Sequence, residues 1–84
     1  MAETKWLAEG VHPPVGPRFV LIEYGSSNAL RRHARGLTFS VDRNANPNLL
    51  EAHIETVLSE AQALADFEQI DTVYVGIPKR GKNS

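Results

Sequence analysis

The clearest hydrophobic pattern in the chain is a helical one that runs from about Pro47 to Gln69. Apolar side chains recur there at intervals of three and four residues, which places them on one stripe of an α-helix. The stripe consists of Leu50, Ile54, Val57, Leu58, Ala61, Leu64 and Ala65. Asn46 is a favoured N-cap residue, and proline is tolerated at the first helical position because that amide would have no helical partner. The pattern therefore predicts one long amphipathic helix.

Residues 18–24 form the most apolar of three predicted strands. Alternation along a strand puts Val20 and Ile22 on one face and Phe19 and Leu21 on the other. A strand that is apolar on both faces is usually central in its sheet or covered on both sides. We therefore place this strand inside the sheet.

Two further segments, residues 37–41 and 72–77, alternate between apolar and polar residues as half-buried strands do. The segment 28–36 is polar and basic, and we interpret it as the long tip of an antiparallel hairpin between 18–24 and 37–41. Residues 1–17 contain apolar side chains but no clear period, so their structure stays open, with an additional strand as one option.

The order of these elements predicts an α+β fold. A strand–helix–strand connection normally places its two strands parallel in one sheet. We expect a small two-layer domain over residues 1–84, with a mixed sheet of three or four strands in the order (β)ββαβ and the helix on one face. Residues 79–84 are expected to form a flexible basic tail. The predicted core is Val20, Ile22, Leu37, Phe39, Val41, Leu50, Ile54, Val57, Leu58, Leu64, Val73, Val75 and Ile77.

Length and composition narrow the functional classes. The 84 residues contain no cysteine, which excludes disulfides and thiolate metal sites. The N-terminus lacks the pattern of a secretory signal, and the longest apolar run, residues 19–22, is far too short to cross a membrane. We expect a cytoplasmic protein that makes no membrane contact, and the composition suits a small accessory protein of a bacterium or a phage.

Catalytic and metal-binding patterns are weak. His12, His33 and His53 fall in three different elements, so we predict no metal site and no cofactor. Ser26 lies near His33 in sequence, but a nucleophilic serine also needs an orienting group and an oxyanion hole, which no motif supplies. An enzymatic site would have to lie around Ser26, His33 and the acidic residue Asp42. We expect a non-enzymatic protein.

The first functional hypothesis is a protein-binding module, which would be an adaptor, an inhibitor or an assembly component. The segment 47–71 carries six acids and no lysine or arginine, although acids at the end of a helix oppose its dipole. An acidic helix face and a basic tip would bind another protein or a second copy of the chain. The interface residues are Glu51, Glu55, Glu60 and Asp66 on the helix and Arg31, Arg32 and Arg35 at the tip. The plainer interpretation of the acids is solubility.

The alternative hypothesis is nucleic-acid binding. Arginines would hold phosphates while aromatic side chains of an open sheet face stack on bases. The contacts would come from Arg31, Arg32, Arg35, the Lys79–Lys82 segment with Arg80, and the rings of Phe19 and Tyr74. In the plainer interpretation the charged segments are solvated, and Trp6, Leu7 and Val11 cover Phe19 and Leu21.

Overall fold

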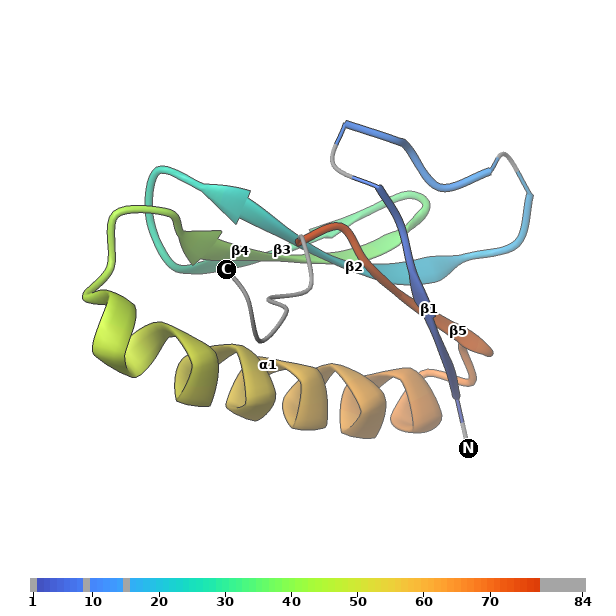
Figure 1. Cartoon of the computed structure of the whole chain (residues 1–84). Helices are drawn as coiled ribbons and strands as arrows, with labels where there is room; N and C mark the ends of the chain where they lie inside the picture. The colour runs from blue at the N-terminus through green and yellow to red at the C-terminus, as the bar shows by residue number, and fades with distance from the viewer. Residues whose placement is uncertain (1, 9, 15, 78–84) are drawn as a thin grey trace.

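The computed structural model describes residues 2–8, 10–14 and 16–77, and in this part of the chain one helix packs on one face of a five-stranded sheet (Figure 1). The elements are β1 (Glu3–Trp6), β2 (Phe19–Gly25), β3 (Ala29–His33), β4 (Gly36–Asp42), α1 (Pro47–Phe67) and β5 (Thr72–Val75). The strands lie in the order β1-β5-β2-β4-β3. The predicted α+β class with two layers is confirmed, and the sheet gains a strand beyond the three or four expected.

The predicted antiparallel hairpin is wrong. Strands β2 and β4 pair in parallel, with Phe19 opposite Gly36, and β3 pairs antiparallel with the outer side of β4. The segment that we interpreted as a basic tip is therefore mostly the edge strand β3. The physical reason is burial: β4 is apolar and occupies the interior of the sheet, whereas the charged side chains of β3 suit an edge.

The helix agrees closely with its prediction. It begins at Pro47, and the side chain of the N-cap Asn46 accepts a hydrogen bond from the backbone N–H of Asn48 at 2.9 Å. The last helical residue is Phe67, two positions before the predicted end. Both β4 and β5 run parallel to β2, so the strands on either side of the helix point the same way, as the crossover rule predicted.

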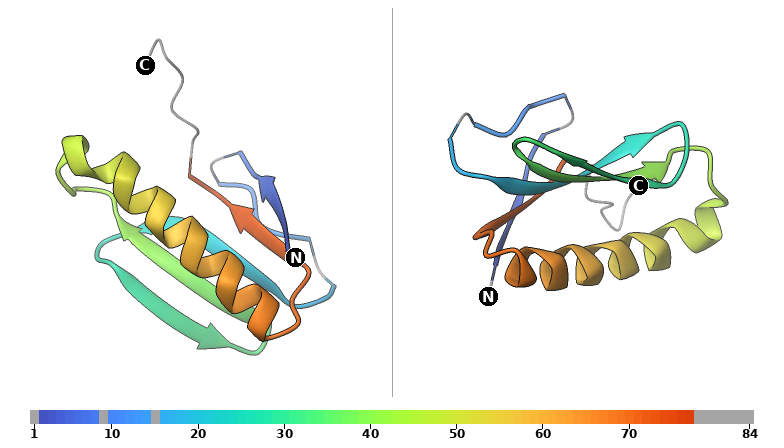
Figure 2. Two further views of the ribbon diagram at one scale, coloured as in Figure 1. Left: turned by 90° about the horizontal axis from the view of Figure 1, so that it is seen from below. Right: turned by 180° about the vertical axis from the view of Figure 1, so that it is seen from behind.

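The hydrophobic core lies between α1 and the sheet. Every predicted core residue is buried except Ile54, Leu58 and Leu64, which are partly buried and pack against the cluster. The core also contains Ala2, Ala61, Ala65 and Ile70. The helix packs on β2, β4 and β5 but not on β3. In the view from below in Figure 2, β3 lies to one side of the helix and is not covered by it.

In the described part of the chain, no helix covers the opposite face of the sheet. The N-terminal part of the chain adds β1 to the sheet beside β5, and the connection from β1 to β2 then rises above this face (Figure 1). Trp6 and Val11, which the plainer interpretation placed over Phe19 and Leu21, are 45% and 51% exposed. The ring contacts of Phe19 come from His33 and Tyr74.

α1 is not the kind of long apolar helix that could cross a membrane.

Candidate functional site

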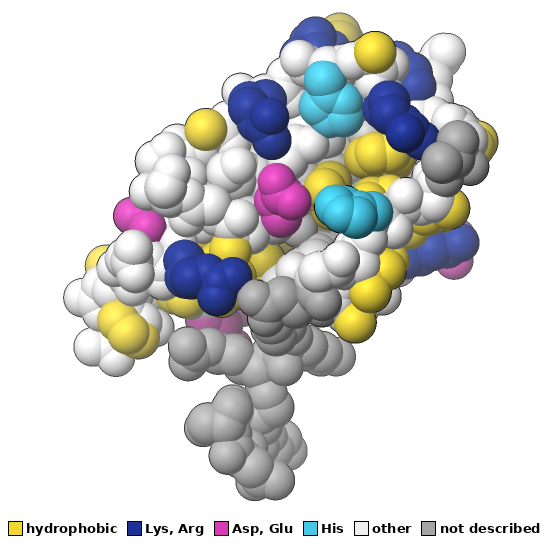
Figure 3. Space-filling view, turned by 90° about the horizontal axis from the view of Figure 1, so that it is seen from above, with side chains coloured by type: hydrophobic (Ala, Val, Ile, Leu, Met, Phe, Trp, Pro, Cys, Tyr) yellow, Lys and Arg dark blue, Asp and Glu magenta, His cyan; other side chains and the backbone are white. Residues whose placement is uncertain are grey.

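A cleft of about 480 Å³ opens on the helix-free face of the sheet. In Figure 3 this face shows a hollow with apolar side chains at its bottom and Lys, Arg and His side chains around it. The lining residues are His12 and Pro13 from the β1–β2 connection, Phe19, Leu21 and Glu23 from β2, Arg31 and His33 from β3, Arg35 from the turn, and Thr38 from β4. The cleft thus combines an apolar floor with a polar and basic rim.

The floor of the cleft follows from strand alternation. Val20 and Ile22 point to the helix, so Phe19 and Leu21 point away from it, as the sequence predicted. Phe19 is only 7% exposed, and its ring meets the ring of Tyr74 edge to face, with 5.9 Å between the centroids. This contact holds the Phe19 ring in place, so the floor is preformed.

The imidazole of His33 forms one wall of the cleft and is held by two hydrogen-bond contacts. Its Nδ1 accepts a hydrogen bond from the backbone N–H of Arg35 at 3.3 Å. Its Nε2 lies within hydrogen-bond distance of Thr38 Oγ1, at 2.9 Å. The ring centroid lies 6.1 Å from that of Phe19. Together these contacts join the turn, the edge strand and the floor.

Two arginines supply the charge of the rim. The guanidinium of Arg35 lies over the Phe19 ring, with its central carbon 5.9 Å from the ring centroid. Arg31 Nη2 lies 3.7 Å from Glu23 Oε2, and the Arg31 side chain is 63% exposed. An exposed ion pair of this kind is weak, so Arg31 is free to exchange Glu23 for another carboxylate. With two arginines against one acid, the rim favours anionic ligands.

Arg32 belongs to a different surface. Because side chains alternate along a strand, Arg32 points to the helix side of β3. Its Nη1 donates to both carboxylate oxygens of Glu68, at 2.8 and 2.6 Å, and Arg18 Nη2 donates to Glu68 Oε1 at 3.2 Å. The hydrogen bond from Arg32, supported by Arg18, lowers the pKa of the Glu68 carboxyl below its ordinary value. The three arginines of the predicted tip are therefore divided between the two faces.

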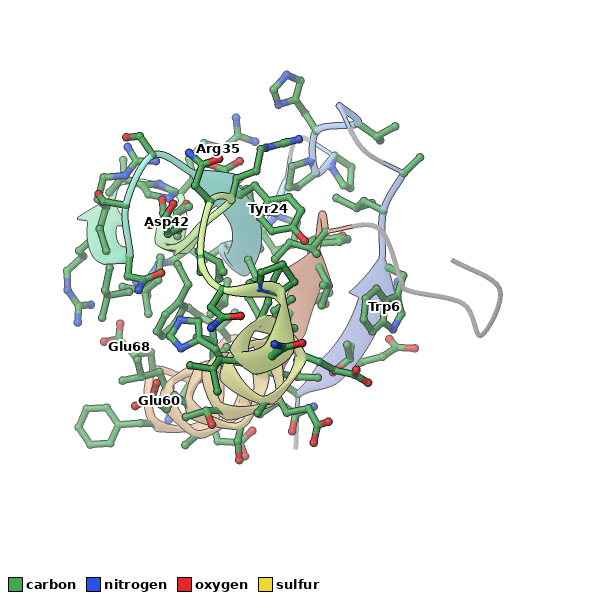
Figure 4. All side chains as sticks on the ribbon, turned by 60° about the vertical axis from the view of Figure 1, so that its left-hand side comes forward. Trp6, Tyr24, Arg35, Asp42, Glu60 and Glu68 are labelled. Atoms are coloured by element: carbon green, nitrogen blue, oxygen red, sulfur yellow. The ribbon has the colours of Figure 1, made fainter. Side chains whose placement is uncertain are left out.

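The predicted acidic surface lies on the other layer of the molecule. Glu51, Glu55 and Glu60 are exposed on α1, and Figure 4 shows Glu60 beside the helix with Arg35 on the far side of the sheet. Asp66 Oδ1 accepts a hydrogen bond from the backbone N–H of Ala2 at 2.9 Å, so this acid ties β1 to the helix. Lys79, Arg80 and Lys82 lie outside the described residues.

The structure does not bring the candidate catalytic residues together. Asn28 Oδ1 accepts a hydrogen bond from the backbone N–H of Asp42, which places Asp42 and the turn at Ser26 at one end of β3. His33 is at the other end, roughly 16 Å away for a strand of this length. Within the described ranges no group of three His, Cys, Asp or Glu side chains is positioned to hold a metal ion.

Sequence reasoning identified Phe19, Arg31 and Arg35 but missed other lining residues. The missed residues include Glu23, His33 and Thr38. Their signal was present, because all three lie on the side of their strands opposite the apolar core positions. This alternation pattern could be recognised as a single surface only once residues 29–33 were known to be a strand.

Comparisons with protein-family models, with curated proteins and with solved structures found no match. The function of the chain is therefore inferred from its own residues.

Proposed function

We propose that this chain is a non-enzymatic protein-binding module whose cleft receives an extended, acidic segment of a partner protein. The observation that carries the proposal is the pairing of a preformed apolar floor with the exposed side chains of Arg31 and Arg35. The partly exposed Leu21 offers the contact surface of this floor, and the nearly buried Phe19 lies beside it. An aliphatic side chain of the partner fits the floor, and flanking carboxylates fit the arginines.

The expected affinity is modest. An exposed arginine–carboxylate pair contributes about 0.2–1 kcal/mol, and burial of one aliphatic side chain contributes about 1.5–3 kcal/mol. Part of this gain is lost in ordering the segment. A dissociation constant on the order of 1 mM is therefore expected for an isolated peptide.

The acidic face of α1 has a second role in the proposal. Glu51, Glu55 and Glu60 are exposed on the layer opposite the cleft. Their charge repels an acidic partner from the helix side and steers it to the basic rim, since surface charges act mainly on association rate and orientation.

Nucleic-acid binding is less well supported by the same geometry. Phe19 is nearly buried under its neighbours and has little ring surface left for a base. Arg32, which would hold a phosphate, is bound to Glu68 on the opposite face. The rim retains two arginines, enough to neutralise only about two phosphates.

The experiment is a fluorescence anisotropy titration with the labelled peptide Ac-Glu-Ile-Glu-Val-Glu-Ile-Glu-NH2. We expect saturable binding at about 50 mM salt that weakens several-fold at about 300 mM, because exposed charge pairs are screened. Charge reversal at Arg31 or Arg35 (Arg31→Glu, Arg35→Glu) should weaken peptide binding about tenfold or more. Lys5→Glu is the matched control, because it makes the same charge change at a residue that does not line the cleft.

Three results would count against the proposal. Binding that is absent, or equally weakened by Lys5→Glu, would remove the cleft as the recognition surface. Tight, steeply salt-dependent binding of a single-stranded oligonucleotide of about 20 residues would reassign the arginines to nucleic acid. A mass by light scattering that rises with concentration and falls with Arg31→Glu would make a second copy the partner.

A further inference from the structure

The edge strand β3 has features of a strand that can accept another. It is the outermost strand on its side of the sheet, and Ala29, Leu30, Arg31 and Arg32 are exposed. Its pairing with β4 runs through all five residues without a bulge. The helix does not extend over it (Figure 2). Nothing among the described elements therefore covers this edge.

Two backbone hydrogen bonds define which backbone groups of β3 face outward. Phe19 N donates to Arg35 O, and Arg43 N donates to Gly25 O, so the odd-numbered residues of β4 direct their backbone groups toward β2. The even-numbered residues of β4 consequently face β3, where their partners are Ala29, Arg31 and His33. The N–H and C=O groups of the remaining two residues, Leu30 and Arg32, therefore point to the free edge.

The charged side chains of β3 do not block this edge. Proteins commonly protect an edge strand with charges that repel an incoming strand. Here Arg32 is held on the helix side by Glu68, and Arg31 lies on the cleft side near Glu23. Between them Leu30 is 49% exposed and offers an apolar contact on the helix side.

We infer that a stretch of the acidic segment that continues beyond the cleft pairs with β3 as a sixth strand, an inference that rests on the proposed function. One carboxylate of the added strand lies beside Arg31 on the cleft side, and an aliphatic residue next to it in sequence lies beside Leu30 on the helix side. A second copy of β3 is disfavoured as the occupant, because the strand has two arginines and no acid, and self-pairing would oppose like charges.

The first measurement is amide hydrogen exchange by NMR. In the free protein the amides of Leu30 and Arg32 should exchange rapidly, whereas those of Arg31 and His33 should be protected by β4. At saturating Ac-Glu-Ile-Glu-Val-Glu-Ile-Glu-NH2, exchange at Leu30 and Arg32 should slow by about tenfold, if about nine-tenths of the protein is bound. No slowing at these two amides would overturn the inference, even if the peptide binds.

The second measurement uses two N-methylated forms of the same peptide. One form is methylated at alternate residues, and the other at the residues between them. Only one set of amides faces β3 in an added strand, so one form should lose binding about tenfold more than the other. Equal tolerance of both forms, with binding still sensitive to Arg31→Glu, would contradict strand addition and leave the cleft proposal standing. If the unmethylated peptide itself does not bind, both the cleft proposal and the strand-addition inference are removed.

Discussion

At the scale of single residues, the close approach of β4 to β2 at Gly36 is the strictest requirement in the sheet. The φ angle of Gly36 is +135°, and a Cβ atom there would lie 1.9 Å from the carbonyl oxygen of Phe19. That oxygen belongs to backbone, which cannot rotate away as a side chain can. Glycine is therefore what allows the parallel pairing to begin directly beneath the cleft floor.

Replacement of this glycine should be costly. We expect Gly36→Ala to lower the free energy of unfolding by about 3 kcal/mol, because it combines an unfavourable φ with overpacking. Gly76→Ala is the matched control: the nearest atom to its added methyl group would be Ile22 O at 3.5 Å, an ordinary contact. Urea denaturation followed by circular dichroism measures both. Equal losses for the two variants would show that the strain at Gly36 is relieved elsewhere.

At the scale of elements, the end of α1 is built from backbone hydrogen bonds without a glycine. Ile70 N donates to Ala65 O at 2.7 Å, and Gln69 N donates to Asp66 O at 3.2 Å, which is the Schellman arrangement. It requires Gln69 to adopt a φ of +59°, a conformation that most side chains disfavour. In return the chain turns sharply, and Ile70 enters the core.

This strain can be removed by one substitution. Gln69→Gly should raise the free energy of unfolding by about 1 kcal/mol, because glycine adopts the left-handed conformation without a steric penalty. Gln69→Ala separates backbone from side-chain effects, since alanine keeps the penalty and should give no gain. Thermal denaturation of the two variants beside the parent tests this. A gain for alanine as large as that for glycine would mean that the glutamine side chain itself is unfavourable.

At the scale of the whole molecule, the sequence revealed local structure and missed the pairing between distant segments. The helix and the strands at 18–24, 37–41 and 72–77 each have their own period, so they were predictable. The direction of β2 against β4 was not, because it depends on which segment takes the edge of the sheet. The cleft floor at Phe19 and Leu21 followed from alternation, whereas the division of Arg31 and Arg32 between two faces required β3.

The carboxylate of Glu68 connects the end of α1 to β3, a strand on which the helix does not pack. It lies at the C-cap of α1 and binds Arg32 of β3 and Arg18, the residue before β2. The Glu68 side chain is 13% exposed, so water screens these contacts less than it screens the outer acids of the helix. The acid that opposes the helix dipole is thus paired with two bases.

This network should make the stability of the fold depend on pH. The pKa of Glu68 is lowered in the folded state, first by the hydrogen bond from Arg32. Its stabilising contribution is complete above the ordinary carboxyl pKa of the unfolded chain and is lost as the pH falls through the lower folded value. Glu68→Gln should therefore reduce the urea midpoint clearly at pH 7 and have little effect once the parent carboxyl is protonated.

Glu60→Gln, which removes an exposed acid with no ion pair among the described residues, should cause no comparable loss at pH 7. A Glu68→Gln deficit that persists unchanged in acid would show that the side chain acts through its shape and not through its charge.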